Sequence, residues 1–419
     1  MIALFFIQMK KIIILLLICH YKLLSQTPDL GKLKPENGNN LRYISIGSSL
    51  SAGVRNGGVY SAAQQTSFPN LVAQQMGIFN FRQALLEGNG SGYESVIVDK
   101  NNNLKFQKNA GLDDSKKLSK IIDEIDNLAL PYLKILDIYE PRSDNNQFVY
   151  KKSFKYLDRL ISTEEEEKIS YLKYLSRVKK IDFFTYELGF HDYIQYVKSG
   201  GLGTSIIYMG ARENYGEIEL LNILTSKNAK GAMANIPDVL DFPIFRYNTL
   251  KKIQKANSTN EIFISYLAKS GVRIAKSLDI FLPTQNISDL MDNTIPDNQK
   301  LGLKPDSPLN DSDVLSIDEI ETISVRGYNK AIIEPLSQKY QLPVVDLYSL
   351  YKSIFKGNYI TDDGVLINPD YPSGNFFSSD GITPTALGQA VIANEFIKVM
   401  NSHFNAKIPL IQTIKFIEK

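Results

Sequence analysis

Three residues that can take part in nucleophilic or acid–base chemistry follow apolar, strand-like runs in this chain: Ser49, His191 and Asp238. Ligands of parallel α/β sheets bind where the strands end, so the spacing predicts that all three lie at one rim of a sheet. A serine hydroxyl needs a base before it can attack, and histidine is the side chain that most often serves near neutral pH. The three runs are residues 41–47, 181–188 and 229–236.

Apolar runs alternate with amphipathic stretches along most of the chain, and this alternation predicts an α/β fold. The expected architecture is a parallel sheet covered by helices on both faces. Helices are predicted at 67–76, 115–128, 317–340 and 385–401, and further strands at 104–106 and 344–347.

Domain boundaries follow from shifts in composition. Residues 26–40 are polar and rich in Gly, Asn and Pro, which predicts a flexible lead-in. One domain is expected from 41 to 410, followed by a tail at 411–419. Within it, residues 242–315 are rich in Asn, Asp and Pro, and we interpret them as an insertion or lid over the rim.

The composition excludes several classes of function. The net charge is +2 and basic residues form only short pairs, so nucleic-acid binding has no electrostatic support. No phosphate loop, dinucleotide fingerprint or metal-ligand cluster is present, so no cofactor and no metal are expected. The acidic run Glu164–Glu166 follows Thr163 in a capping-box pattern, which favours a solvated helix start over a metal site.

The N-terminus has the pattern of an export signal, with Lys10 and Lys11 before an apolar run that is too short to span a bilayer. Residues 1–25 are therefore predicted to be a signal peptide, and Met9 is an alternative start. Cys19 is the single cysteine, and either it is lost on cleavage or it carries a lipid anchor. The expected location is periplasmic, outer-membrane-associated or extracellular, with no membrane span.

Several passages together resemble the SGNH (GDSL) hydrolases, a lipase and esterase family, and in particular exported GDSL-like proteins of Bacteroidetes-type bacteria. The resemblance extends from about residue 41 to residue 409 and implies a three-layer, flavodoxin-like fold. The similar passages are 47–53, 67–70, 183–201, 229–238, 314–328 and 379–396.

The resemblance implies a role for each matching position. Ser49 matches the nucleophile and Asp380 the triad aspartate, but Thr383 stands where the catalytic histidine should be, and threonine cannot act as a base near neutral pH. Asp114 falls at the oxyanion glycine of the second block, unless Gly111 takes that role in a shifted register.

His191 replaces the oxyanion asparagine of the family's Gly-x-Asn-Asp block. Two interpretations are open: His191 fills space and bonds a backbone group, or it is a relocated base for Ser49. His403, beyond the last helix, is expected to be too far from Ser49 to act.

Two functions follow as expectations. The first is an exported, non-catalytic family member that binds a ligand or partner in the old cleft, for which an acylated sugar or lipid is the candidate. The second is an active esterase that uses Ser49 with His191 as base, backed by Asp192 or Asp380. Loss of an oxyanion donor costs about 10²–10³ in rate and loss of the base costs more, which favours the first. An unrelated role, such as a surface or secretion-complex component, is the third alternative.

Overall fold

The computed structural model describes most of the chain outside the N-terminus. The described residues are 27–35, 40–87, 90–92, 94–99, 103–108, 118–121, 123–139, 153–161, 169–201, 214–266 and 271–417. The predicted signal peptide with Cys19, the Glu164–Glu166 run, Gly111 and Asp114 lie outside them.

A four-stranded parallel sheet forms the centre of the fold, in the order β1-β6-β7-β12. A parallel bridge joins Ser45 of β1 to Asn127, so the segment at Asn127 runs along the outer edge of β1. The predicted α/β class with a parallel sheet is confirmed. The strands are β1 (Tyr43–Gly47), β6 (Phe183–Glu187), β7 (Lys230–Ala234) and β12 (Val344–Val345).

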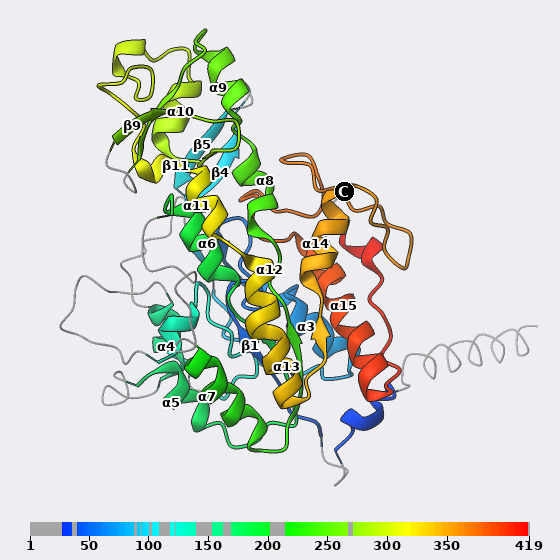
Figure 1. The fold of residues 1–419 in the computed structure, drawn as a ribbon. Coiled ribbons are helices and arrows are strands. Elements are labelled where there is room, and N and C mark those ends of the chain that lie inside the picture. Colours follow the sequence, from blue (N-terminus) through cyan, green and yellow to red (C-terminus); the bar gives the residue numbers. More distant parts are fainter. Residues whose placement is uncertain are drawn as a thin grey trace, which may run out of the picture.

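Helices cover both faces of this sheet, as the side-chain contacts of strand β6 show. Phe183 packs edge-on against Phe404 of α15, with ring centroids 6.0 Å apart. Tyr186 points to the opposite face, where its hydroxyl donates to Glu217 of α7 at 2.7 Å. Because successive side chains of a strand alternate between faces, α15 and α7 lie on opposite sides of the sheet (Figure 1).

The helices vary in length, and α15 is the longest that the structure describes. On the α15 face, Phe68 of α3 stacks on Phe396 at 4.6 Å. The main helices are α3 (Phe68–Gln75), α4 (Phe154–Leu160), α5 (Tyr171–Ser176), α6 (Phe190–Lys198), α7 (Asn214–Thr225), α8 (Pro243–Arg246), α14 (Leu347–Phe355) and α15 (Ala386–Phe404).

Part of the segment 242–315 forms a lobe with a second hydrophobic cluster, separate from the main core. Ile253, Ile264, Phe281 and Leu290 are central to this cluster, and each is at most 1% exposed. The lobe contains α9 (Leu250–Ala256), β8 (Phe263–Tyr266), β9 (Gly271–Ile274), β10 (Ile280–Phe281), α10 (Gln285–Met291) and β11 (Val314–Leu315).

A hairpin from far earlier in the chain, β4 (Glu94–Val98) with β5 (Leu104–Lys108), lies beside this lobe (Figure 1). Ser288 Oγ of α10 donates to the Leu104 carbonyl at 2.9 Å. The strand predicted at 104–106 therefore exists, but it pairs in an antiparallel hairpin outside the main sheet.

Two predicted helices are wrong in part. The described residues of 115–128 contain no helix, because the end of this stretch runs along β1 instead. The predicted helix 317–340 is interrupted at Ile323, where Ser324 begins a new helix by accepting a hydrogen bond from the Gly327 amide. The pieces are α11 (Ile317–Thr322), α12 (Val325–Tyr328), a π-helical turn (Asn329–Ile333) and α13 (Glu334–Tyr340).

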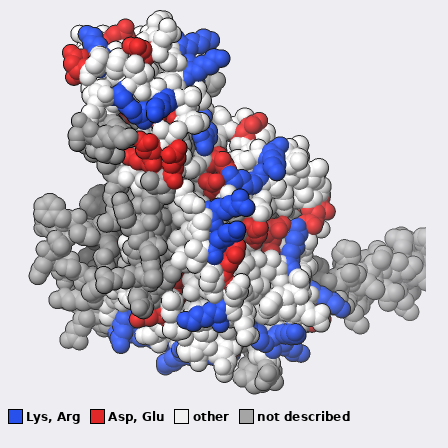
Figure 2. All heavy atoms as spheres, in the orientation of Figure 1, with Lys and Arg blue, Asp and Glu red and all other residues white. Residues whose placement is uncertain are grey.

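Part of the predicted lead-in packs against the domain. Leu33 is buried, and Asp29 forms an antiparallel bridge with Lys407. No helix among the described residues is long and apolar enough to cross a membrane. Positive and negative side chains are interspersed over the face drawn in Figure 2.

Candidate functional site

Ser49 lies in the tight turn that follows β1, and only 2% of it is exposed. The neighbouring Ser48 hydroxyl donates to the Leu133 carbonyl at 2.8 Å. Ser49 Oγ accepts a hydrogen bond from the backbone N–H of Tyr132 at 3.0 Å. The Tyr132 amide therefore holds the Ser49 hydroxyl in place, and it would have to leave Oγ before it could donate to the oxygen of a bound carbonyl.

Tyr132 was missed by the sequence reasoning, which placed the second oxyanion donor near Asp114. It has a φ of +65°, a left-handed conformation that non-glycine residues rarely adopt. The loop is held to the Ser49 turn by Asn127, whose Nδ2 donates to the Ser51 carbonyl at 3.0 Å. The available signals were Asn127, which the predicted helix 115–128 had covered, and Pro131, which lies just beyond that helix and marks a turn.

Glu187, the last residue of β6, lies buried beneath the Ser49 turn. Its Oε2 accepts from the backbone N–H groups of Ser48 and Ser51 at 3.2 Å each, and from the Ser51 hydroxyl at 2.9 Å. Oε1 is buried and has no hydrogen-bond partner among the described residues. Burial raises the pKa of Glu187 to about 7, although these hydrogen bonds favour the charged form. Sequence reasoning gave this carboxyl group no role.

His191 lies in the first turn of α6, which begins after Gly189, a residue with φ of +92°. The imidazole ring is 9% exposed and packs edge-on against the Tyr132 ring, with centroids 5.3 Å apart. The next residue, Asp192, turns away from the cavity. Both of its carboxylate oxygens accept from the Ile135 amide, at 3.1 and 3.2 Å, and burial raises its pKa well above the usual range.

Asp380 is saturated with hydrogen bonds from nearby loops. Oδ1 accepts from the amides of Ile382 and Thr383 at 2.8 and 2.7 Å. Oδ2 accepts from the Gly57 amide at 2.9 Å and from the Thr383 hydroxyl at 2.5 Å. The Thr383 hydroxyl also lies 3.0 Å from the Ser378 hydroxyl. Thr383 is therefore a structural partner of the Asp380 carboxylate.

One cavity of about 440 Å³ joins these residues, and Ser49, His191, Asp380 and Thr383 all line it. A cavity of this size is typical of small-molecule sites. The remaining lining residues are Val54, Gly57, Tyr132, Phe190, Ile194, Gln195, Lys198, Ile244, Pro283, Thr284, Gln285 and Ile382.

The cavity does not contain every residue that the sequence suggested. Asp238 is absent from its lining and instead accepts from Lys352 Nζ at 2.9 Å. His403 is in the last turn of α15, roughly 25 Å along that helix from its start near Thr383. Among the described residues, no group of three or more His, Cys, Asp or Glu is arranged to hold a metal ion.

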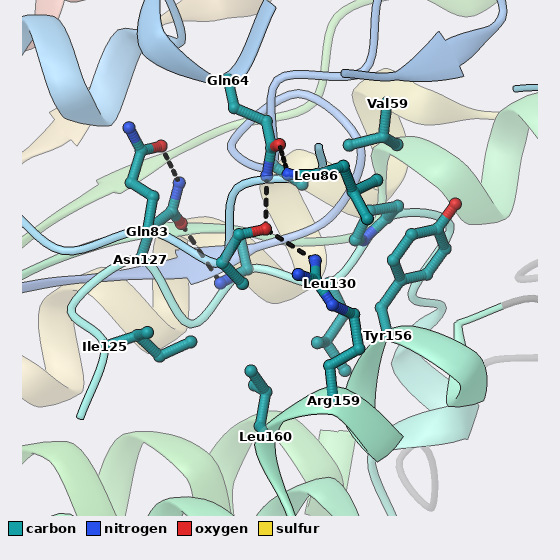
Figure 3. Close-up of a pocket in the computed structure, with 14 residues that line it drawn as sticks. Val59, Gln64, Gln83, Leu86, Ile125, Asn127, Leu130, Tyr156, Arg159 and Leu160 are labelled. Atoms are coloured by element: carbon teal, nitrogen blue, oxygen red, sulfur yellow. Dashed lines mark hydrogen bonds between the residues drawn. The ribbon is translucent and has the colours of Figure 1, made fainter. Parts of the chain in front are cut away.

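A second, much smaller cavity of about 20 Å³ is lined in part by Ala129, Leu130 and Pro131, which come just before Tyr132 in the chain (Figure 3). The guanidinium of Arg159 closes one side by donating to the carbonyls of Ala84 and Leu85 at 2.7 and 2.8 Å. Gln64 Nε2 donates to the same Ala84 carbonyl at 2.9 Å. This volume suits one or two water molecules, so the cavity is part of the support for the loop and not a ligand site.

Comparison with known proteins adds no relative. No family model matches the chain, and the searches of curated proteins and of solved structures found no match either. The fold and the site therefore define an α/β protein with a parallel sheet and a cavity of about 440 Å³ beyond the ends of its strands.

Proposed function

We propose that this protein is an SGNH-type member of the α/β class that binds a small acyl-bearing ligand in the 440 Å³ cavity, with ester hydrolysis weak or lost. The observation that carries the proposal is that Ser49, His191, Asp380 and Thr383 line one cavity. The strand arrangement supports the scaffold, because the edge segment at Asn127 followed by β1, β6, β7 and β12 has the flavodoxin-like order 2-1-3-4-5.

The hydrogen bonds around the cavity favour binding over catalysis. A triad needs a base next to the nucleophile and a carboxylate that orients the base. Thr383 cannot be that base, and its hydroxyl is committed to Asp380. Asp192 and Asp380, the two carboxylates expected to back His191, accept other hydrogen bonds, Asp192 from the Ile135 amide and Asp380 from the loops around it. Loss of the base alone reduces the catalytic rate of a serine hydrolase by several orders of magnitude.

An active esterase is the second candidate, and one observation favours it. His191 faces the same cavity as Ser49 and not the core, and the Tyr132 amide already points at Ser49 Oγ. In that case His191 would take the hydroxyl proton as Ser49 Oγ attacks the carbonyl carbon, and the Tyr132 N–H would move from Oγ to the carbonyl oxygen that becomes the oxyanion. Export of the protein stays a prediction from residues 1–25.

Two measurements on purified protein separate these functions. The first is hydrolysis of p-nitrophenyl acetate, p-nitrophenyl butyrate and acetylated sugars by the natural protein and by Ser49→Ala. The second is the rise in melting temperature caused by methyl butyrate and methyl octanoate. We expect equal, near-background hydrolysis in both proteins and a melting-temperature rise that Ile194→Trp abolishes by filling the cavity.

A matched control is Ile360→Trp, since Ile360 is 61% exposed and remote from the cavity lining. Hydrolysis by the natural protein that disappears in Ser49→Ala would contradict the binding proposal and support the active esterase. Both functions are contradicted if the natural protein shows no hydrolysis and the esters cause no melting-temperature rise that is lost in Ile194→Trp and kept in Ile360→Trp.

A further inference from the structure

The hydroxyl of Ser49 is held by a second residue of the same cavity wall. Ser49 and Tyr132 both line the cavity, and Ser49 Oγ accepts from the Tyr132 N–H at 3.0 Å. A serine side chain consists of Cβ and Oγ alone, so a hydroxyl that joins two lining residues lies at or next to the cavity surface. The group that a ligand would meet at this point is therefore a hydroxyl in a fixed position.

The Tyr132 amide is held in its direction by attachments on both sides. The Leu130 amide donates to the Gly47 carbonyl at the end of β1, at 3.1 Å. The Leu133 carbonyl accepts from the Ser48 hydroxyl at 2.8 Å. Between these attachments, Tyr132 has the left-handed φ of +65°. A strained backbone of this kind persists only where the surrounding contacts fix it, so these contacts keep the N–H directed at the serine hydroxyl.

The hydrogen-bonding capacity of Ser49 is only partly used. A hydroxyl carries one proton to donate and two lone pairs that accept. The Tyr132 N–H occupies one lone pair of Oγ, and no residue that the structure describes accepts the Ser49 proton. Thr383, another hydroxyl in the wall, differs because it donates to Asp380 Oδ2 at 2.5 Å. Ser49 therefore offers the cavity a donor that Thr383 does not.

A simpler explanation is that a water molecule in the cavity accepts the Ser49 proton. A cavity of about 440 Å³ has room for water at this wall. A ligand that fills the cavity displaces this water, and Ser49 is only 2% exposed. The ligand must then accept the proton itself, because a buried donor without an acceptor lowers the affinity. Water in the empty cavity thus leads to the same requirement for the ligand.

The rest of the wall indicates which kind of molecule carries the acceptor. Apolar side chains in the lining include those of Val54, Phe190, Ile194, Ile244 and Ile382. They favour a ligand with a hydrocarbon body, and the acceptor that an acyl chain contains is its carbonyl oxygen. Ser49 can bind this oxygen while it keeps its proton. A nucleophile, in contrast, must transfer that proton to a base as it attacks the carbonyl carbon.

We propose that Ser49 donates a hydrogen bond to the carbonyl oxygen of the bound acyl group and thereby selects carbonyl-bearing ligands over apolar molecules of similar size. The inference rests on the proposed function, because it assumes that the cavity binds an acyl-bearing ligand. The Tyr132 N–H stays on Oγ throughout, and no bond to the carbonyl carbon forms. The ligand class is an aliphatic chain with a carbonyl group, such as an ester or a ketone.

The test compares methyl octanoate with methyl octyl ether, which has a methylene group in place of the carbonyl. Isothermal titration calorimetry gives the dissociation constant of each probe for the natural protein and for Ser49→Ala. We expect Ser49→Ala to bind the ester about fivefold more weakly, the size of effect typical of one neutral hydrogen bond. Its affinity for the ether should stay nearly unchanged, because the ether has no carbonyl oxygen. Ser402→Ala is the control, since Ser402 is exposed on α15 and outside the cavity lining.

A second measurement reads the hydrogen bond directly in the natural protein. A hydrogen bond to a carbonyl oxygen lowers the stretching frequency of the carbonyl. Methyl octanoate labelled with carbon-13 at the carbonyl should therefore absorb at a lower infrared frequency in the protein than in hexane. The shift should be kept in Ser402→Ala and lost in Ser49→Ala.

The inference is overturned, with the proposed function intact, if Ser49→Ala binds the ester as tightly as the natural protein or weakens both probes equally. A bound carbonyl that absorbs as it does in hexane would also overturn it. Hydrolysis of methyl octanoate that stops in Ser49→Ala would overturn it in favour of the active esterase. If the natural protein does not bind methyl octanoate, and neither methyl ester raises its melting temperature, the proposed function itself has failed.

Discussion

The hydroxyl of Thr383 donates a hydrogen bond to Asp380 Oδ2 at 2.5 Å. The two residues occupy the positions where a histidine and its orienting aspartate are expected in the family that the sequence resembles. The Thr383 hydroxyl supplies one of the four hydrogen bonds that the buried Asp380 carboxylate accepts. Asp380 also accepts from the Gly57 amide, which ties the loop after Ser49 to the loop before α15.

Asp380→Ala should destabilise the protein strongly. It would leave three backbone N–H groups and the Thr383 hydroxyl without their acceptor in a buried loop. We expect a loss of about 3 kcal/mol in the free energy of unfolding, measured by urea denaturation. Thr383→Val removes one donor and should cost about 1 kcal/mol. Equal costs for the two variants would contradict the view that the carboxylate organises both loops.

A histidine at position 383 provides a second prediction, which rests on the proposed SGNH-type site. In the double variant Thr383→His with His191→Asn, Asp380 would orient the new imidazole and the new amide would donate to the oxyanion. We expect hydrolysis of p-nitrophenyl acetate to rise by roughly 10²-fold, the lower end of the range for general base catalysis. The same double variant with Ser49→Ala should stay at background. An unchanged rate would point to a further defect, with the Tyr132 loop as the first suspect.

Stability should fall as the pH rises from about 4.5 to 7. The pKa of Glu187 is about 7 in the folded protein against 4.5 for an ordinary glutamate, so the native state holds a proton that the unfolded chain releases in this range. The raised pKa values of Asp192 and Glu217 act in the same direction. Glu187 alone corresponds to a decrease on the order of 3 kcal/mol, complete above its folded pKa.

Urea denaturation at several pH values between 4 and 8 measures this slope. Glu187→Gln keeps an oxygen for the Ser48 and Ser51 donors and cannot titrate, so its slope should be shallower, with the remaining slope due to Asp192 and Glu217. Glu334→Gln, at an exposed position on α13, should leave the slope unchanged. A slope in Glu187→Gln equal to that of the natural protein would show that Glu187 does not carry the proton.

The buried carboxyl group of Glu217, on the face of the sheet that α7 covers, supplies the fourth prediction. Glu217 accepts from the hydroxyls of Tyr186 and Tyr328 at 2.7 and 2.8 Å. Tyr186→Phe should cost about 2 kcal/mol of unfolding free energy, because one acceptor oxygen of a fully buried carboxyl group loses its partner.

The matched control is Tyr359→Phe, which removes a hydrogen bond to the less buried Glu395 and should cost below about 1 kcal/mol. If thermal or urea unfolding shows the same loss in both variants, burial does not set the strength of the Glu217 bonds.

The sequence predicted the main strands well and some connections poorly. The runs before Ser49 and His191 became β1 and β6, since continuous apolar segments are typical of strands buried on both faces. The helix predicted at 115–128 is wrong because pairing along β1 outweighs the helical spacing of the apolar residues in this stretch. That pairing joins Ser45 to Asn127 and depends on a neighbour far away in the chain.

Local pattern thus determined that this is an α/β protein and that Ser49, His191 and Asp238 follow strand ends, because periodicity and burial are properties of neighbouring residues. Tertiary structure alone decided that the Tyr132 amide, 83 residues from Ser49, donates to its hydroxyl. It also decided that Glu187 lies beneath that turn and that the lobe completes the cavity. Hydrogen bonds between distant segments depend on how whole elements pack, and no short-range pattern in the chain encodes that packing.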